Sequence, residues 1–163
     1  MISEAQKRQM TDAVAEIRAR MADAARAAGR DPKDVLLCAA CKTRTVEEVR
    51  YSADLPIDLF GENHVQELVE KTDAAAYNGK PGHFIGHLQT NKVNKVVGRA
   101  ALIQSVDSTR LLDKIDAAAA RLDVVQGWRS TSGRKPAKAA WTPMGCSRCW
   151  NLPPPRSISG CAG

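Results

Sequence analysis

Apolar residues recur at helical spacing in the first part of the chain. Val14, Ile17 and Met21 follow one another every three or four positions, which gives one apolar stripe along an alanine-rich stretch. Ser3 and the glutamine three residues later form a capping box, the pattern that opens a helix. We therefore predict a long helix that begins after Ser3 and ends at about Ala28.

The next apolar stretch has no helical spacing. Residues 35–41 are apolar without interruption, and Lys42 follows them. A short run of this kind, preceded by Asp31-Pro32, is typical of a parallel-sheet strand that is buried on both faces. We therefore expect residues 35–41 to form a central buried strand, with Lys42 at its carboxyl end.

Strands and helices are predicted to alternate along the rest of the chain. Further strands are expected at 57–60, 83–85, 101–106 and from 124 onward, and helices at 45–53, 65–76, 91–97 and 108–122. This alternation predicts a parallel α/β fold, either a barrel or a doubly wound sheet. A Gly-x-Gly-x-x-Gly turn does not follow the first strand, which weighs against a dinucleotide-binding fold.

Charge and composition change abruptly after residue 126. The net charge of +6 comes from residues 127–163, where six lysines and arginines stand without any acid. All three tryptophans, five of the eight prolines and three of the five cysteines also lie there. We therefore expect residues 1–126 to form part of one domain and residues 127–163 to form an aberrant, irregular tail.

Composition also restricts the function. The chain has no apolar run of membrane-spanning length and no apolar signal segment at Met1, so we expect a cytoplasmic protein without a membrane partner. The basic excess is confined to the tail, so we expect no nucleic-acid partner. We expect no metal site either, because Cys146-x-x-Cys149 lacks a second ligand pair and His83 and His87 do not share a helix face.

Polar residues follow three of the predicted strands. They are Lys42 after the first strand, residues 61–63 after the second and residues 86–92 after the third. The carboxyl ends of parallel strands meet at one edge of the sheet, where ligands bind. A lysine beside apolar walls can form a Schiff base with an aldehyde, because desolvation lowers the pKa of its amine. The alternative is that Lys42 is a solvated residue that opens a loop.

Two further motifs complete a resemblance to a known family. Residues 60–67 read Phe-Gly-Glu-Asn-x-x-Gln-Glu, and residues 83–92 read His-x-Ile-Gly-x-Leu-Gln-x-Asn-Lys. With the strand-end lysine, residues 1–126 resemble the pyridoxal phosphate homeostasis proteins, the YggS/PROSC-like family, which are similar to the N-terminal barrel of bacterial alanine racemase. The resemblance implies that the chain contains the N-terminal half of a TIM (β/α)8-type barrel.

The resemblance also implies a cofactor site. Lys42 would hold pyridoxal 5′-phosphate (PLP) as a Schiff base, and Asn63, Gly86, His87 and Leu88 would lie near the cofactor. Family members buffer or deliver PLP, so the partners implied are PLP and PLP-requiring apoenzymes, and the protein is expected to be a monomer. Because the family lacks robust turnover, we expect no catalytic residue.

Two alternatives remain open at this stage. A PLP-dependent amino-acid racemase would need a second catalytic residue, typically a tyrosine from a further domain, and it is disfavoured because Tyr51 and Tyr77 are predicted on or after helices rather than at strand ends. A non-functional truncated fragment is the other alternative, because half a barrel leaves two open sheet edges and lacks the phosphate-binding segment of its relatives.

The composition of residues 127–163 resembles GC-rich coding DNA translated out of frame. Permitted codons for residues 127–140, read from one base earlier, encode Leu-Glu-Val-Asn-Ile-Gly-Thr-Glu-Ala-Ser-Lys-Gly-Gly. This peptide is a strand that ends in asparagine, followed by a Glu-x-x-Lys-x-Gly loop, as the family has. We therefore expect a one-base slip near codon 127 in the gene or its recorded sequence. A genuine divergent tail is the alternative.

Overall fold

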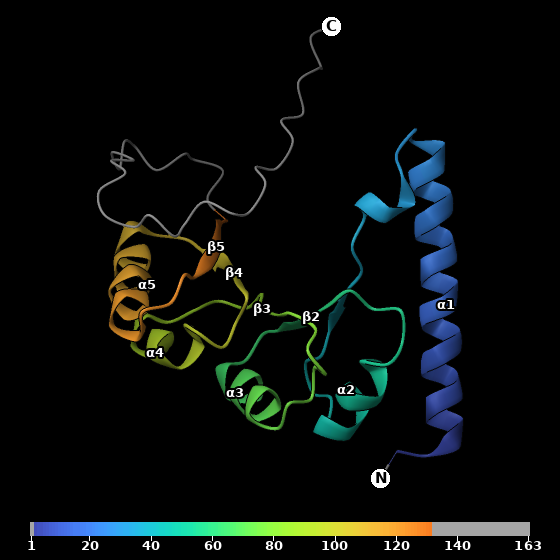
Figure 1. Cartoon of the computed structure of the whole chain (residues 1–163), viewed down its shortest axis with the longest axis horizontal. Coiled ribbons are helices and arrows are strands. Elements are labelled where there is room, and N and C mark those ends of the chain that lie inside the picture. The colour runs from blue at the N-terminus through green and yellow to red at the C-terminus, as the bar shows by residue number, and fades with distance from the viewer. Residues whose placement is uncertain (1, 132–163) are drawn as a thin grey trace, which may run out of the picture. The chain divides into compact units, whose positions relative to one another are not determined.

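The computed structural model describes residues 2–131, which form alternating helices and strands (Figure 1). The helices are α1 (Glu4–Ala27), α2 (Val46–Ser52), α3 (Val65–Asp73), α4 (Val93–Val96) and α5 (Thr109–Leu122), with short 3-10 turns at η1 (Pro32–Asp34) and η2 (Thr90–Lys92). The strands are β1 (Cys38–Ala40), β2 (Leu59–Glu62), β3 (Gly82–Phe84), β4 (Leu102–Val106) and β5 (Gly127–Ser130). The Cys146-x-x-Cys149 pair and most of the expected tail lie outside the described residues.

The sheet decides between the two architectures that the alternation left open. All five strands are parallel, and their order in the sheet, β1-β2-β3-β4-β5, is their order in the sequence. A doubly wound sheet reverses its strand order at a switch point, whereas a barrel adds each strand beside the one before it. Helices α2 to α5 lie on one side of the sheet (Figure 1). The prediction of a partial TIM-type barrel is therefore confirmed.

The starts of α1, α2 and α5 follow local capping signals, whereas α3 and α4 begin without a side-chain capping hydrogen bond. The Ser3 hydroxyl accepts a hydrogen bond from the Gln6 amide, and the Gln6 side chain accepts one from the Ser3 amide. Thr45 and Glu48 make the same reciprocal pair at the start of α2. These bonds satisfy amide groups that would otherwise lack partners in the first turn of each helix.

The prediction that the first strand is buried on both faces was wrong. Leu36 is 62% exposed and Cys38 is exposed, whereas Leu37 and Ala39 pack against the core. The strand itself is only three residues long. Within the described residues β1 pairs only with β2, and the helices cover one face of it. Its side chains therefore alternate between the core and an uncovered face.

The fifth strand begins later than the sequence predicted. Residues 124–126 are irregular, and β5 runs over Gly127–Ser130, past the expected boundary at residue 126. Backbone pairing with β4 continues to Thr131, whose amide donates to the Val106 carbonyl at 3.0 Å. None of the four β5 residues is buried. This strand is therefore held by backbone hydrogen bonds rather than by core side chains.

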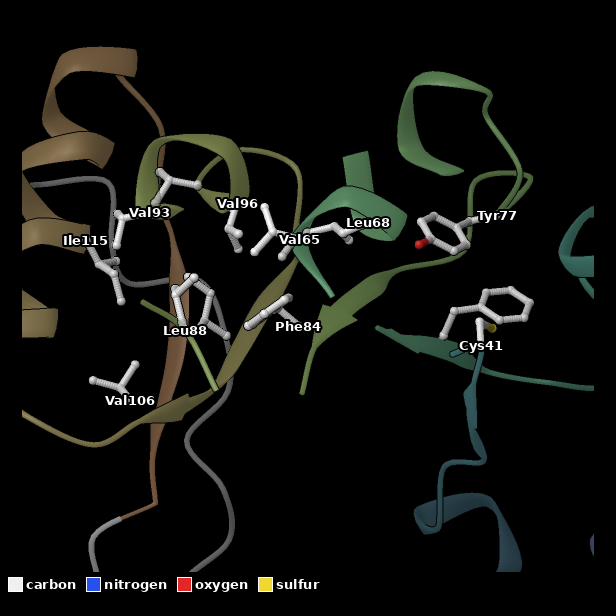
Figure 2. Close-up of a cluster of buried hydrophobic side chains, with 14 of the residues drawn as sticks. Cys41, Val65, Leu68, Tyr77, Phe84, Leu88, Val93, Val96, Val106 and Ile115 are labelled. Atoms are coloured by element: carbon white, nitrogen blue, oxygen red, sulfur yellow. The ribbon is translucent and has the colours of Figure 1, made fainter. Parts of the chain in front are cut away.

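The core lies between the sheet and its helices (Figure 2). Three successive strands each contribute a completely buried side chain to this core: Phe60, Phe84 and Ile103. The Phe60 ring stacks on that of Tyr77, with 5.4 Å between ring centroids. Because side chains alternate along a strand, the residues next to these three face the opposite side of the sheet. None of the helices in residues 2–131 has both the length and the apolar character needed to cross a membrane.

Candidate functional site

The ends of β1, β2 and β3 lie in register at the carboxyl edge of the sheet. The Cys41 amide donates to the Gly61 carbonyl at 2.9 Å, and the Ile85 amide donates to the Glu62 carbonyl at 2.9 Å. Lys42 and Asn63 therefore follow neighbouring, paired strands. The sequence predicted this convergence from the parallel arrangement alone.

Lys42 and Asn63 follow side chains that point into the core. Cys41 is 4% exposed and Glu62 is fully buried on the helix side of the sheet. Both residues lie just beyond their strands, Lys42 in a turn and Asn63 in a bend. Lys42 is exposed and Asn63 is half-buried, and neither side chain makes a hydrogen bond or ion pair within residues 2–131. An amine and an amide at this edge are thus available to a ligand.

Gly86 brings the end of β3 against Asn63. A Cβ atom at Gly86 would lie far inside van der Waals contact with the Asn63 carbonyl, so a larger residue would push the two strand ends apart. The Gly86 carbonyl accepts a hydrogen bond from the Ser105 hydroxyl on β4. The glycine of the second motif therefore sets how closely the ends of β2 and β3 approach each other, and its carbonyl links this point to β4.

His87 and Leu88 are placed differently from each other. The His87 side chain is exposed, and its Nδ1 lies 3.4 Å from a carboxylate oxygen of Asp107. Leu88 is 2% exposed and belongs to the core cluster with Phe84 and Ile115 (Figure 2). Only the backbone of Leu88 is therefore available to a ligand at this edge. The cofactor role of both residues stays a prediction.

Lys42 occupies a tight turn from Cys41 to Arg44. The Arg44 amide donates to the Cys41 carbonyl at 3.0 Å, which closes the turn. Thr43 has φ +63°, a left-handed conformation that is costly for a β-branched residue, by about 1–3 kcal/mol. Its amide donates to Glu67 Oε2 at 3.0 Å. Contacts outside the turn must therefore hold this backbone in place.

Lys71 lies at the centre of the group that supplies these contacts. It is 1% exposed, and its Nζ donates to the Cys41 carbonyl at 2.7 Å, to Glu62 Oε1 at 2.9 Å and to Glu67 Oε2 at 3.1 Å. The Tyr77 hydroxyl also donates to Glu62 Oε1, at 3.2 Å. One ammonium group thus joins the turn to two carboxylates.

Burial and pairing act against each other on these groups. Burial raises the pKa of Glu62 despite its hydrogen bond from Lys71. Burial alone would lower the pKa of Lys71, but the hydrogen bonds to Glu62 and Glu67 outweigh it, so that pKa is raised. Burial would raise the pKa of Glu67, yet its bonds from Lys71 and the Thr43 amide lower it. Lys71 is therefore held as a cation by its two partners.

Glu67 and Lys71 were not predicted to have a role from the sequence. Their spacing of four residues on a predicted helix is the pattern of an intrahelical ion pair and could have identified them. Glu62 was grouped with the polar residues of the sheet edge, but its side chain points to the helix layer. Nearby, burial raises the pKa of the Cys41 thiol to about 12, so this cysteine is not an activated nucleophile.

Known proteins share this architecture. No protein-family model matches the chain. A solved structure described as an unknown protein from Bifidobacterium adolescentis superposes with a TM-score of 0.72 at 34% identity, covering 78% of this chain and 56% of the other. PipY from Synechococcus elongatus, solved with PLP bound, gives a TM-score of 0.53 at 31% identity, covering 65% of this chain and 50% of PipY.

Curated relatives share sequence with this chain. The pyridoxal phosphate homeostasis protein of Aquifex aeolicus is 37% identical over 107 residues, which cover 66% of this chain and 47% of the relative. That of Pseudomonas aeruginosa is 35% identical over 102 residues, covering 63% and 44%. This chain is a homologue of the pyridoxal phosphate homeostasis proteins. It spans about half the length of these relatives. The resemblance inferred from the two motifs is thereby confirmed.

Proposed function

We propose that this chain binds PLP through a Schiff base on Lys42 and serves intracellular PLP homeostasis. Formation of the Schiff base joins Lys42 Nζ to the aldehyde carbon, and the aldehyde oxygen leaves as water. Asn63 and the Gly86–Leu88 turn border the cofactor in this proposal. The protein acts as a monomer in the cytoplasm and passes the cofactor to PLP-requiring apoenzymes.

One observation carries the proposal: Lys42 is an exposed, unpaired amine, within residues 2–131, at the carboxyl edge of a parallel sheet. The chemistry of the available groups fits the cofactor, because an aldehyde needs an amine and Asn63 adds an amide that can donate or accept a hydrogen bond. The PipY structure with PLP bound supports the same cofactor for this homologue. The free thiols of Cys38 and Cys41 are compatible with a reducing compartment.

A racemase-like enzyme is disfavoured by the positions of the two tyrosines. The Tyr77 hydroxyl is committed to buried Glu62 on the helix side of the sheet. The Tyr51 hydroxyl bonds to Lys7 and Thr11 of α1. Neither hydroxyl is therefore available as an acid or base beside Lys42, which supports a binding role without turnover.

The direct test is capture of the cofactor with borohydride. The full chain is mixed with PLP, the Schiff base is reduced to a stable amine, and the modified lysine is identified by peptide mass spectrometry. We expect modification of Lys42 and a visible absorbance band that is absent from Lys42→Ala. Lys33→Ala, which removes an exposed lysine from η1, is the matched control and should behave like the wild type. Equal labelling of Lys42→Ala and wild type would contradict the proposal.

A further inference from the structure

We propose that Glu67 and Lys71 are positioning residues, which hold the Cys41–Arg44 turn and so direct the Lys42 amine. This inference rests on the proposed role of Lys42. It assigns a task to an ion pair on α3 that lies outside the cofactor-binding set of Lys42, Asn63 and residues 86–88. Neither residue needs to touch the cofactor.

The pair binds the backbone on both sides of Lys42. On the N-terminal side, Lys71 Nζ donates to the Cys41 carbonyl at 2.7 Å. On the C-terminal side, Glu67 Oε2 accepts from the Thr43 amide at 3.0 Å. Lys71 and Glu67 are also bonded to each other at 3.1 Å. The two peptide groups that flank Lys42 are thus fixed to one side-chain pair, while the Lys42 side chain has no partner among residues 2–131.

The backbone between these two contacts needs such support. Thr43 is β-branched and has φ +63°, and this conformation persists only where surrounding contacts impose it. The bond from its amide to a carboxylate is a charge-assisted hydrogen bond, which is stronger than a neutral one. Without Glu67, Thr43 is free to return to an ordinary φ value, and this rotation changes the direction in which the preceding residue projects.

The Glu67–Lys71 pair is itself held in place by buried contacts. Lys71 is almost completely buried, and its third bond goes to Glu62 Oε1, at 2.9 Å. Glu62 lies on β2, the strand that pairs with β1, so the sheet and α3 are joined at the same point. A rotation of the Lys71 side chain would leave Glu62 without its cation. The turn is therefore held through buried contacts with the core rather than through contacts at the solvent-exposed surface.

The test compares three variants of the full chain. Glu67→Ala removes the acceptor, Glu67→Gln keeps a neutral acceptor, and Glu70→Ala changes an exposed glutamate on the same helix. Hydrogen exchange of the Thr43 amide, measured without cofactor, reports on the turn. The rate of borohydride capture of PLP at Lys42 reports on the amine. Circular dichroism verifies that each variant is folded.

We expect Glu67→Ala to speed exchange at Thr43 and to slow capture at Lys42, each by about tenfold, the factor that corresponds to one lost hydrogen bond to a charged group. Glu67→Gln should restore most of both, and Glu70→Ala should match the wild type. Unchanged exchange and capture in Glu67→Ala would overturn the inference, as would equal losses in Glu67→Ala and Glu70→Ala. If wild type captures no PLP at Lys42, the proposed function fails. Thr43 exchange alone then decides whether Glu67 holds the turn.

Discussion

Replacing Lys71 with methionine should cost much of the stability of the folded chain. The substitution removes the cation that Glu62 faces at 2.9 Å and leaves that carboxylate with one remaining hydrogen bond, from Tyr77. Glu62 is 0% exposed, and its Oε2 already lacks a hydrogen-bond partner within the described residues. Bulk water therefore does not reach this carboxylate in the folded chain.

The expected loss is about 3–5 kcal/mol, the range for removing one member of a buried ion pair. Domains of this size have a free energy of unfolding of about 5–15 kcal/mol, so the variant should remain folded with only a small margin of stability. Because the free energy of unfolding falls by about 2 kcal/mol per M of urea, this loss lowers the urea concentration at the unfolding midpoint by about 1.5–2.5 M. Urea unfolding followed by far-UV circular dichroism measures this shift.

The loss should also depend on pH. Burial already raises the pKa of Glu62, and removal of Lys71 raises it further. Above about pH 4.3 the unfolded chain releases this proton while the folded variant keeps it, so stability falls as pH rises toward the folded pKa. The penalty of Lys71→Met should therefore be smaller at pH 5 than at pH 7.

Two further variants test whether Glu62 and Lys71 form a buried ion pair. Lys71→Met combined with Glu62→Gln replaces the stranded carboxylate with a neutral amide and should recover part of the loss. Lys114→Met changes an exposed lysine on α5 and should alter stability by no more than about 0.5 kcal/mol. A loss below about 1 kcal/mol in Lys71→Met, or no recovery in the double variant, would show that Glu62 and Lys71 are not a buried ion pair.

Three other outcomes follow from the structure and the sequence. Gly86→Ala should cost about 1–3 kcal/mol in urea unfolding and weaken PLP capture, because its Cβ collides with the Asn63 carbonyl; a fully stable variant would contradict this packing. Cys41, with its pKa near 12, should be alkylated at pH 8 on the order of a thousandfold more slowly in the native chain than after unfolding; equal rates by peptide mapping would exclude the buried thiol. Sequencing the DNA from codon 120 to well past codon 163 should show that one base restores Leu-Glu-Val-Asn and that the restored frame continues downstream, whereas a read without such a continuation would establish the tail as genuine.

Local signals were sufficient for the starts of α1 and α2 and for the edge of the sheet where Lys42 lies. The capping pairs at Ser3 and Thr45 depend on residues three positions apart, so the sequence contains all the necessary information. The convergence of Lys42 and Asn63 follows from the parallel alternation, which places every strand end at the same edge.

The errors arose where a property depends on distant neighbours. The sequence of an apolar run does not reveal whether a second layer of structure covers it. Leu36 is exposed because one face of the sheet is uncovered at this edge within the described residues. The pleat of β2 decides that Glu62 points to the helices, and pairing with β1 and β3 sets which residues of the strand face that side. The support of Lys42 by Glu67 and Lys71 depends on packing α3 against the sheet.

The order of the strands also has a kinetic consequence. Each strand pairs with the next one in the sequence, and paired residues such as Cys38 and Leu59 are roughly twenty positions apart. Because these loops are of similar length, closing each one costs about the same chain entropy as closing the one before it. No strand pairing within residues 2–131 depends on a distant part of the chain. The topology therefore permits the strands to add to the sheet in the order in which they are synthesised, starting from β1.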